Sequence, residues 1–427
     1  MKRLQQLLDS YRFQVALTFC VSLTIFLIGC SVLSPLQQQA QAQRQALQTT
    51  TSRTFADWCV NKTNLSSSTR HTIEMLLREV ETTDCVQANK KLSSRTELGI
   101  EGEGITDISP LSSLTNLKNL SLSVNEISDI SPLSSLTNLT LLNLDRNNKI
   151  SDIAPLKHLT NLTELALFGN QISDLAPLND LTKLTVLALT SNQIKSLNNL
   201  TNLTNLTKLS LTDNQISNVN SLKYLTNLKD LSLGINKIFD VSPLKSLTNL
   251  NTLFINRNQI SDISPLQFLT NLTTLYISEN QISDISSLRF MTKLTEVDLG
   301  HNKIFDISML YGINLTYLQL TNNRIEDVSS LKFLRTLTVL SLADNQISDI
   351  SPLKSLTKLT ELYLSENQLS DVSALKYLTS LTMLDLANNR ISDISMLKPL
   401  TNVRQLYLEG NPLRNKKCPL QFYRCEY

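Results

Sequence analysis

A phrase of 22 residues recurs from residue 98 almost to the end of the 427-residue sequence, and this period constrains the fold more than any other feature. Its common form is L-T-N-L-T-x-L-x-L-x-x-N-x-I-S-D-I-S-P-L-x-S. The L-x-L core alternates as a short β-strand does, with every second residue pointing inward. One unit cannot bury its apolar face alone, so successive units have to stack, and stacking aligns their strands into one parallel sheet. The sequence therefore predicts a solenoid. A coiled coil is the alternative, but heptads are absent and Pro recurs.

An asparagine follows each L-x-L core at a fixed place. The chain has to turn there, which leaves inward backbone N–H and C=O groups without sheet partners, and a carboxamide can both donate and accept. Repeated in register, these side chains would form a ladder. We assign it to Asn125, Asn148, Asn170, Asn192, Asn214, Asn236, Asn258, Asn280, Asn302, Asn323, Asn345, Asn367, Asn389 and Asn411. The spacing is 22 residues, except for 23 before Asn148 and 21 before Asn323, and Glu103 takes the place in a degenerate first unit, which makes about fifteen units.

The other side of each unit carries the phrase S-D-I-S-P-L. Residues such as Ile127 and Ile130 would close the core behind the turn. Ser followed by Pro, as at Ser131 and Pro132, suits the N-cap and first position of a brief helical turn of the 3-10 type. The recurrent Asp, as at Asp129, could form a calcium ladder, but its place before this turn favours local capping. The predicted fold is an α/β solenoid with a parallel β-sheet on the concave face and short 3-10 turns on the convex face.

The two ends of a solenoid expose apolar core and need covers. Residues 53–97 do not share the repeat, and we expect them to form a small helical N-terminal cap. Within them, Ile73, Leu76, Leu77 and Val80 have the spacing of one apolar helix face. The repeats are expected over 98–413 and a C-terminal cap over 414–427.

The first thirty residues have the pattern of an export signal. Lys2 and Arg3 precede an apolar run over 16–29. The run ends in Leu-Ile-Gly before Cys30, which resembles the bacterial lipobox, whose cysteine is lipidated and becomes the mature N-terminus. Residues 1–30 would then be the signal peptide and Cys30 the lipidation site.

Two other fates of the export signal remain open. Ala40-Gln41-Ala42 fits an ordinary signal-peptidase site, and residues 16–33 could instead stay uncleaved as an anchor. All three alternatives export the rest of the chain. Residues 31–52, rich in Gln, Ala and Thr, would form a flexible tether.

Four of the six cysteines lie outside the signal, and an exported chain favours disulfides. The two caps are separated by about fourteen strands at roughly 4.8 Å each, which puts bridges between the ends out of reach. We predict the pairs Cys59–Cys85 and Cys418–Cys425, one in each cap, with free thiols as the alternative. Neither pair has the spacing of a zinc site.

The repeat phrase is the leucine-rich-repeat pattern, and over about residues 98–413 it closely resembles the internalins of pathogenic bacteria. The resemblance implies the solenoid fold; host invasion is not carried over with it. No LPXTG motif or immunoglobulin-like segment follows Asn411, so we expect anchoring from the N-terminus. In this respect the chain is more similar to the lipobox-bearing repeat proteins of other bacteria, cyanobacteria included.

Catalysis is not indicated. The three histidines do not pair with a nearby Cys, Ser or acid in a catalytic frame, and no Walker A, GxGxxG or HExxH motif is present. We expect no enzyme activity, no cofactor and no metal. A net charge of +2, from 39 basic and 37 acidic residues, gives no reason to expect nucleic acid.

The outward positions of the concave sheet are not part of the core, so their side chains face solvent and are available to a ligand. Between the two leucines they are small and polar in the N-terminal half, and aromatic or acidic in the C-terminal half. Exposed aromatic residues beside an arginine are typical of binding hot spots. The candidate ligand-binding residues are Phe254, Arg257, Tyr276, Glu279, Glu296, Asp298, His301 and Tyr317. The alternative is that these aromatic residues only stack along the sheet and stabilise it.

The sequence thus indicates an exported, envelope-attached monomer that binds another protein through its concave face. Glycan or envelope binding is the alternative function. Membrane contact would come from the N-terminal lipid or anchor, in the periplasm or at the cell surface; a released, secreted protein is the other possibility.

Overall fold

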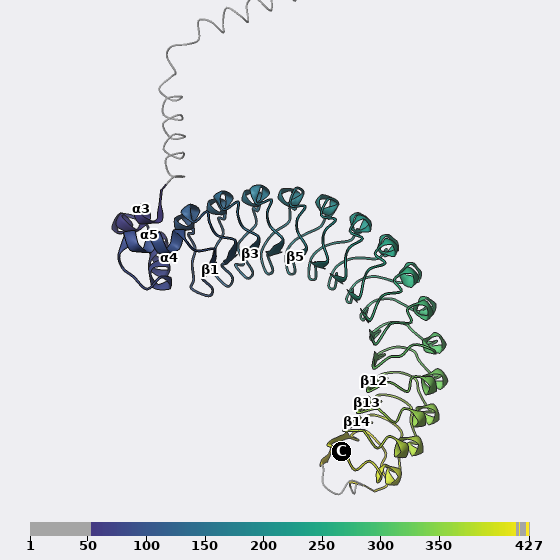
Figure 1. Cartoon of the computed structure of the whole chain (residues 1–427). Helices are drawn as coiled ribbons and strands as arrows, with labels where there is room; N and C mark the ends of the chain where they lie inside the picture. The colour runs from purple at the N-terminus through teal and green to yellow at the C-terminus, as the bar shows by residue number, and fades with distance from the viewer. Residues whose placement is uncertain (1–52, 416–417, 419–423, 427) are drawn as a thin grey trace, which may run out of the picture.

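The computed structural model describes residues 53–415, 418 and 424–426. The chain forms an open arc, with strands along its inner edge, short turns along its outer edge and a helical cap at its N-terminal end (Figure 1). The predicted solenoid is confirmed. The described residues contain no helix long and apolar enough to cross a membrane. The signal, Cys30 and the tether lie outside them.

The inner edge is one parallel sheet in which the strands follow their sequence order from β1 to β16. Equivalent residues of neighbouring units pair, so Leu120 lies beside Leu142 and the outward Ser121 beside Asn143. The strands are β1 Glu97–Gly99, β2 Asn119–Ser121, β3 Leu141–Asn143, β4 Glu164–Ala166, β5 Val186–Ala188, β6 Lys208–Ser210, β7 Asp230–Ser232, β8 Thr252–Phe254, β9 Thr274–Tyr276, β10 Glu296–Asp298, β11 Tyr317–Gln319, β12 Val339–Ser341, β13 Glu361–Tyr363, β14 Met383–Asp385, β15 Gln405–Tyr407 and β16 Arg424–Glu426.

The core runs along the length of the arc between sheet and turns. Each unit supplies seven apolar positions that stack on those of its neighbours. In the unit of β2 they are Leu120, Leu122, Ile127, Ile130, Leu133, Leu136 and Leu139, each at most 1% exposed. Burying one such side chain contributes about 1.5–3 kcal/mol, so the stacking of units is the main source of stability.

The outer edge carries one 3-10 turn per unit, as the sequence predicts. The turns are η2 Ser109–Ser113, η3 Ser131–Ser135, η4 Ala154–His158, η5 Ala176–Leu178, η6 Asn198–Leu200, η7 Asn220–Tyr224, η8 Ser242–Ser246, η9 Ser264–Phe268, η10 Ser286–Phe290, η11 Ser308–Leu310, η12 Ser329–Phe333, η13 Ser351–Ser355, η14 Ser373–Tyr377 and η15 Ser395–Leu397.

The capping of these turns differs from the prediction. Serine is the first residue of the turn and proline the second, while the N-cap residue is apolar, as Ile130 is before η3. The Asp129 carboxylate accepts the Ser131 N–H at 2.8 Å instead. Assigning the cap to serine was therefore wrong, because the N–H of that serine is itself bonded to the carboxylate of the aspartate two residues earlier. The recurrent aspartates cap locally.

The asparagine ladder runs inside the turn that follows each strand. The Nδ2 of Asn258 donates to the carbonyls of Leu233 at 3.0 Å and Ile255 at 3.2 Å, and its Oδ1 accepts the Ile238 N–H at 2.9 Å. Each amide thus joins two neighbouring units. This satisfies backbone groups that would otherwise be buried without partners.

The assignment of Asn148 to the ladder is wrong, because Asn147 occupies that place. Asn147 is 1% exposed and accepts the Ile127 N–H at 3.1 Å, whereas Asn148 is exposed with φ +62°. The extra residue of this unit therefore follows the ladder position instead of preceding it. At the next ladder position, Asn170 Oδ1 is buried and has no hydrogen-bond partner within the described residues.

A second asparagine ladder on the outside was not predicted. The Asn of L-T-N-L donates to a carbonyl of the preceding unit, as Asn138 does to Thr115 at 2.9 Å. Asn116 makes the same bond to Ser93, at the end of the cap. The other members are Asn161, Asn205, Asn227, Asn249, Asn271 and Asn402.

The N-terminal cap consists of helices α3 Phe55–Val60, α4 Ser67–Glu79 and α5 Cys85–Ser93, with the short turn η1 Lys62–Asn64. A disulfide joins Cys59 in α3 to Cys85 at the start of α5, with the Cα atoms 5.5 Å apart. Ser66 caps α4 by accepting the Thr69 N–H at 3.1 Å. The apolar face predicted for this helix is buried: Ile73, Leu76, Leu77 and Val80 are each at most 5% exposed.

The C-terminal segment extends the sheet by one strand. β16 pairs with β15, and its backbone register sets Cys425 beside Leu406. Cys418 is disulfide-bonded. The side chain of Cys425 lies outside the described part of the chain, so the pair Cys418–Cys425 stays a prediction.

Candidate binding surface on the concave sheet

Five of the candidate residues form a continuous patch over β8 to β11, which we call the concave cluster: Phe254, Tyr276, Glu296, Asp298 and Tyr317. The rings of Phe254 and Tyr276 meet edge to face with centroids 5.0 Å apart, and those of Tyr276 and Tyr317 stack at 6.2 Å. All five side chains are half-buried. The sheet therefore holds three adjacent aromatic rings in fixed places, with part of each open to a ligand.

Carboxylates lie against these rings. The hydroxyl of Tyr276 donates to Glu296 at 3.3 Å, and Ser278 donates to Asp298 at 2.8 Å. Burial, followed by the charge of Glu296, raises the pKa of Tyr276 to about 12. Burial, with Asp298 and Glu296 beside the ring, also raises the pKa of Tyr317. The cluster thus combines apolar ring surface with negative charge.

The other three candidates, Arg257, Glu279 and His301, lie at the edge of the sheet. Each is exposed and has a φ of +53° or +54° in the turn directly before a ladder asparagine. Arg257 Nε and Glu279 Oε1 form an ion pair at 2.7 Å. Exposed pairs of this kind contribute little to stability, about 0–1 kcal/mol. The three residues border the concave cluster.

A pocket of about 350 Å³ adjoins the cluster on its C-terminal side. Sequence reasoning missed it as a site. The residues that line it include Tyr317, Ser341, Glu361, Tyr363 and Asp385. We call these five residues the tyrosine pocket. The missed signal was the run of small side chains on and after β12, which leaves space between two tyrosine-bearing strands.

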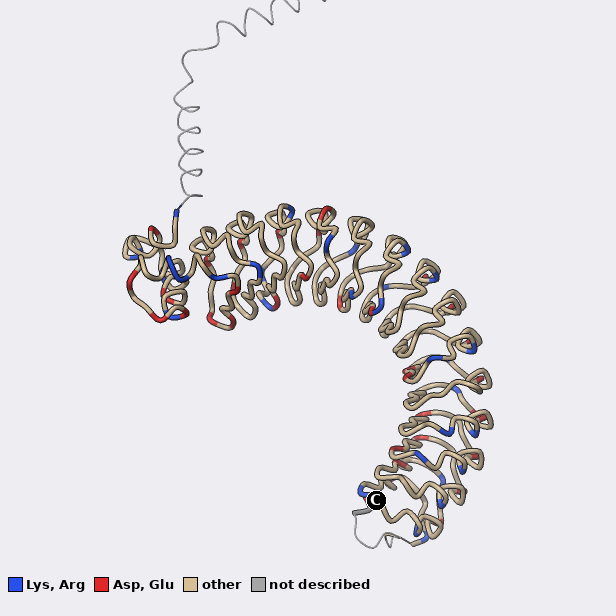
Figure 2. Tube along the Cα trace, in the orientation of Figure 1, with Lys and Arg blue, Asp and Glu red and all other residues tan. Residues whose placement is uncertain are grey.

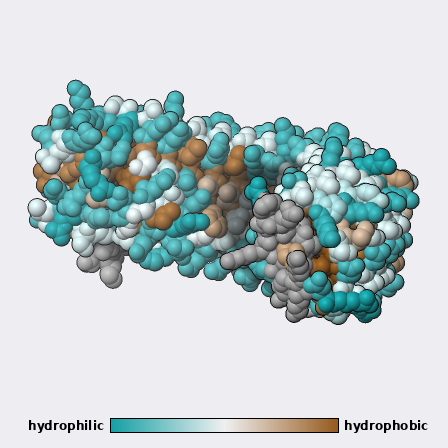
Figure 3. Space-filling view, turned by 90° about the horizontal axis from the view of Figure 1, so that it is seen from below, coloured by the Kyte–Doolittle hydropathy of each residue, from teal (hydrophilic) through white to brown (hydrophobic). Residues whose placement is uncertain are grey.

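The whole arc shows where charged and apolar residues lie. Acidic residues lie along its inner edge both near the N-terminal repeats and in the C-terminal half (Figure 2). Seen from below, apolar residues gather in patches along the hollow face between hydrophilic margins (Figure 3). A groove with apolar patches and a polar rim is the composition expected of a protein-binding surface.

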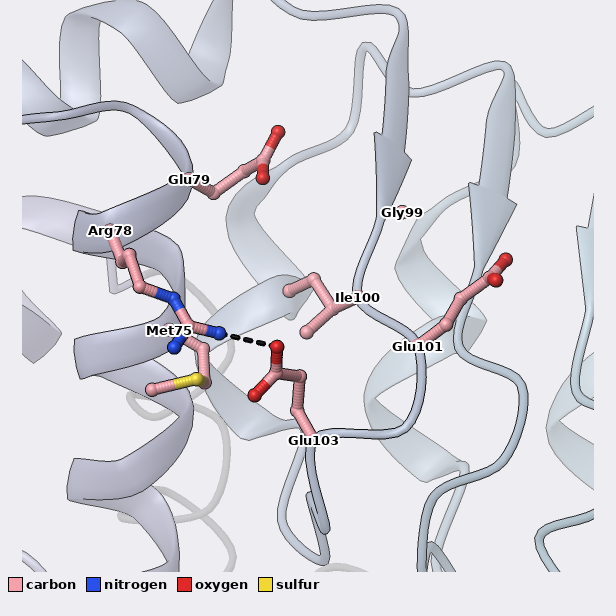
Figure 4. A pocket seen from close by; sticks show the side chains of 7 residues that line it. All are labelled: Met75, Arg78, Glu79, Gly99, Ile100, Glu101 and Glu103. Atoms are coloured by element: carbon pink, nitrogen blue, oxygen red, sulfur yellow. Dashed lines mark hydrogen bonds and ion pairs between the residues drawn. The ribbon is translucent and has the colours of Figure 1, made fainter.

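A second pocket, of about 310 Å³, lies where α4 meets the first repeat. Met75, Arg78 and Glu79 from the helix face Gly99, Ile100, Glu101 and Glu103 across it (Figure 4). Arg78 is ion-paired with Glu103, the residue in the first ladder position. The Glu103 carbonyl is 2.7 Å from His71 Nε2. Glu103 therefore holds helix α4 of the cap against the first repeat, and the pocket lies at this contact between α4 and the repeat.

Asp107 also joins the cap to the first repeat. Thr72 donates to its carbonyl at 2.7 Å, and Thr69 donates to its carboxylate. Among the described residues, no group of three or more His, Cys, Asp or Glu side chains could hold a metal ion.

The comparisons with known proteins agree with the solenoid fold. The family description "Leucine Rich repeats (2 copies)" matches residues 115–158, 160–202, 226–268, 270–312, 335–377 and 379–418, which is more than half of the chain. The chain belongs to the leucine-rich-repeat family. A single-repeat description of the family also matches residues 202–219 and 313–329. Among curated proteins, none is significantly similar to the chain.

Solved leucine-rich-repeat structures share the fold. An internalin of Listeria monocytogenes is 36% identical, with a TM-score of 0.64 over 77% of this chain and 89% of that one. The functional domain of another internalin of that bacterium, which includes a cysteine ladder, is 25% identical, with a TM-score of 0.64 over 74% of each chain. The ectodomain of a plant receptor kinase from Arabidopsis thaliana, solved with Casparian strip integrity factor 2, is 27% identical, with a TM-score of 0.63 over 74% of this chain and 41% of that one. Leucine-rich-repeat proteins of these kinds are generally protein-interaction modules.

Proposed function

We propose that this leucine-rich-repeat protein is exported, is attached to the cell envelope and binds another protein through the concave cluster and the tyrosine pocket. The observation that carries the proposal is the row of three half-buried aromatic rings with four carboxylates on the concave strands. Tyrosine-rich centres with a polar rim supply most of the free energy in protein interfaces. The Arabidopsis receptor kinase, which was solved in complex with Casparian strip integrity factor 2, supports a binding role for a solenoid of this kind.

Paired substitutions on the two faces test the proposal. Tyr276→Ala with Tyr317→Ala removes two rings from the concave cluster. Phe268→Ala with Phe333→Ala removes two rings from the outer turns, where they are 51% and 59% exposed. We expect the concave pair to abolish affinity capture of the partner from envelope extracts and the outer pair to leave it intact. Unchanged capture with a lower melting temperature for the concave pair would mean that the rings only stabilise the sheet.

Glycan binding is the second candidate, because tyrosine and acid lie side by side in register, as Tyr276 and Asp298 do. Such pairs can hold a sugar ring by stacking and hydrogen bonds. A glycan array separates the two functions. Saturable binding to one glycan class that is lost in the concave double variant would favour it over protein.

Attachment to the envelope is proposed through lipid on Cys30, and the Cys59–Cys85 disulfide fits an extracellular protein. In the parent protein we expect labelling with a radioactive fatty acid and a mature N-terminus at Cys30, and Cys30→Ala should abolish the labelling. A mature N-terminus directly after Ala42 would support release instead. An unprocessed, unlabelled protein in the detergent phase would support the uncleaved anchor.

A further inference from the structure

The tyrosine pocket is a box built on three neighbouring strands. Tyr317 and Gln319 stand on β11 and, two strands away, Glu361 and Tyr363 stand on β13, with Ser341 on β12 between them. Strands are about 4.8 Å apart, so the backbones of β11 and β13 are roughly 10 Å apart. Ser341 is 5% exposed and forms a shallow floor. A planar or rod-shaped side chain can enter between the two tyrosines.

The box is negatively charged. Glu361 and Asp385 line it, and Glu296 and Asp298 lie beside Tyr317. No lysine, arginine or histidine is among the lining residues. Within the described residues, none of these four carboxylates is in an ion pair.

The partners of these carboxylates are neutral and leave acceptor positions free. Tyr363 donates its hydroxyl to Glu361 at 2.8 Å, and the Ala387 N–H donates to Asp385 at 3.0 Å. An ionised carboxylate can accept about four hydrogen bonds. The same charge acts on the ring, since burial together with Glu361 and Asp385 raises the pKa of Tyr363 to about 12.

We propose that the tyrosine pocket receives one cationic side chain, a lysine or an arginine, of the bound protein. This proposal rests on the proposed function of the concave face. The cation lies against the tyrosine rings, whose faces attract positive charge. Its N–H groups donate to Glu361 and Asp385. Because these carboxylates are in no ion pair within the described residues, they favour a charged donor over a neutral one. An acidic side chain is repelled from the same place, so the pocket selects the partner by charge.

The test is a titration of the whole protein with small probes. The protein carries 3-fluorotyrosine, and the fluorine resonances of Tyr317 and Tyr363 are assigned by tyrosine-to-phenylalanine replacement. The probes are acetyl-arginine methylamide, acetyl-lysine methylamide and the neutral acetyl-citrulline methylamide. We expect the two cations to shift both resonances and citrulline to bind about tenfold more weakly. Tyr224 and Tyr377, on the outer turns, should not shift. Equal binding of arginine and citrulline, or shifts confined to the outer tyrosines, would overturn the proposal.

Charge-removing variants test whether the carboxylates of the tyrosine pocket are responsible for arginine binding. Glu361→Gln with Asp385→Asn should weaken arginine binding about tenfold or more, whereas Glu326→Gln, at an exposed position outside the strands, should leave it unchanged. Equal binding by both variants would overturn the proposal. Circular dichroism spectra equal to that of the parent protein show that the variants are folded.

The outcomes separate this proposal from the one on which it rests. If the concave double variant Tyr276→Ala, Tyr317→Ala abolishes partner capture but arginine binds no better than citrulline, the pocket proposal fails and the concave interface stands. If arginine binds in the pocket but the outer pair alone abolishes capture, the proposed function fails. The assignment of the cation to a protein partner is then overturned with it.

Discussion

Replacing Asn147 by alanine should destabilise the solenoid, whereas changing its neighbour Asn148 should not. Asn147 Oδ1 accepts the N–H of Ile127, which is fully buried, and that N–H makes no other hydrogen bond among the described residues. Leaving a buried N–H without a partner costs about 1–3 kcal/mol. This is the largest part of the expected loss.

The donor side of the same amide adds less. Asn147 donates to the carbonyls of Leu122 and Leu144, but each carbonyl also accepts from another ladder residue, Asn125 at 3.0 Å and Asn170 at 3.1 Å. Neither carbonyl is left alone, so only the modest net free energy of two shared bonds is lost. The total for Asn147→Ala is about 2–4 kcal/mol.

Asn148→Gly is the matched control. Asn148 is exposed and has φ +62°, a conformation that glycine adopts without steric cost. Its effect should stay within about 1 kcal/mol. Urea unfolding followed by circular dichroism gives the overall effect. Hydrogen exchange of peptides from residues 119–150 gives the local one, which is needed because long repeat arrays do not unfold in one cooperative step. A loss for Asn148→Gly equal to or larger than that for Asn147→Ala would refute the reasoning.

Two further predictions concern pH and the cap. Because folding raises the pKa of Tyr276 and Tyr363 from 10.0 to about 12, their contribution to stability is complete below pH 10 and is lost as the pH rises through 12. The free energy of unfolding should therefore fall less steeply between pH 10 and 12 in the Tyr276→Phe, Tyr363→Phe variant, and equal slopes would contradict this. Cys59→Ser with Cys85→Ser opens a bridge between residues 26 apart, which should lower cap stability by about 3 kcal/mol. Limited proteolysis at residues 53–97 measures the loss, and unchanged cleavage rates would argue against a stabilising bridge.

The regular part of the fold could be predicted from the sequence because each structural role has its own period. The inward leucines of L-x-L and the isoleucines behind the turn are buried as predicted. What failed were choices between polar residues close together in the sequence. Asn147 and Asn148 are indistinguishable as letters, and only the stacking of units decides which side chain turns inward. Likewise Asp129, rather than Ser131, caps its turn because of backbone geometry.

The site was harder to predict than the fold. The row from Phe254 to Tyr317 could be named because the outward strand positions follow from the period. The tyrosine pocket could not, since it depends on Ser341 being small between two larger neighbours, a relation across three units. The joint between Glu103 and α4 was also missed, because a cap outside the repeat has no register from which to infer its contacts.

Site-specific photocrosslinking in cells tests the central claim, that a protein binds the concave face, most directly. A photoreactive phenylalanine analogue replaces Tyr276 or Tyr317 on the sheet, or Phe268 or Phe333 on the outer turns. We predict that both concave positions give one adduct of the same mass, that the outer positions do not, and that an excess of unlabelled protein removes it. Adducts from the outer positions alone, or the same adducts from both faces, would contradict the account.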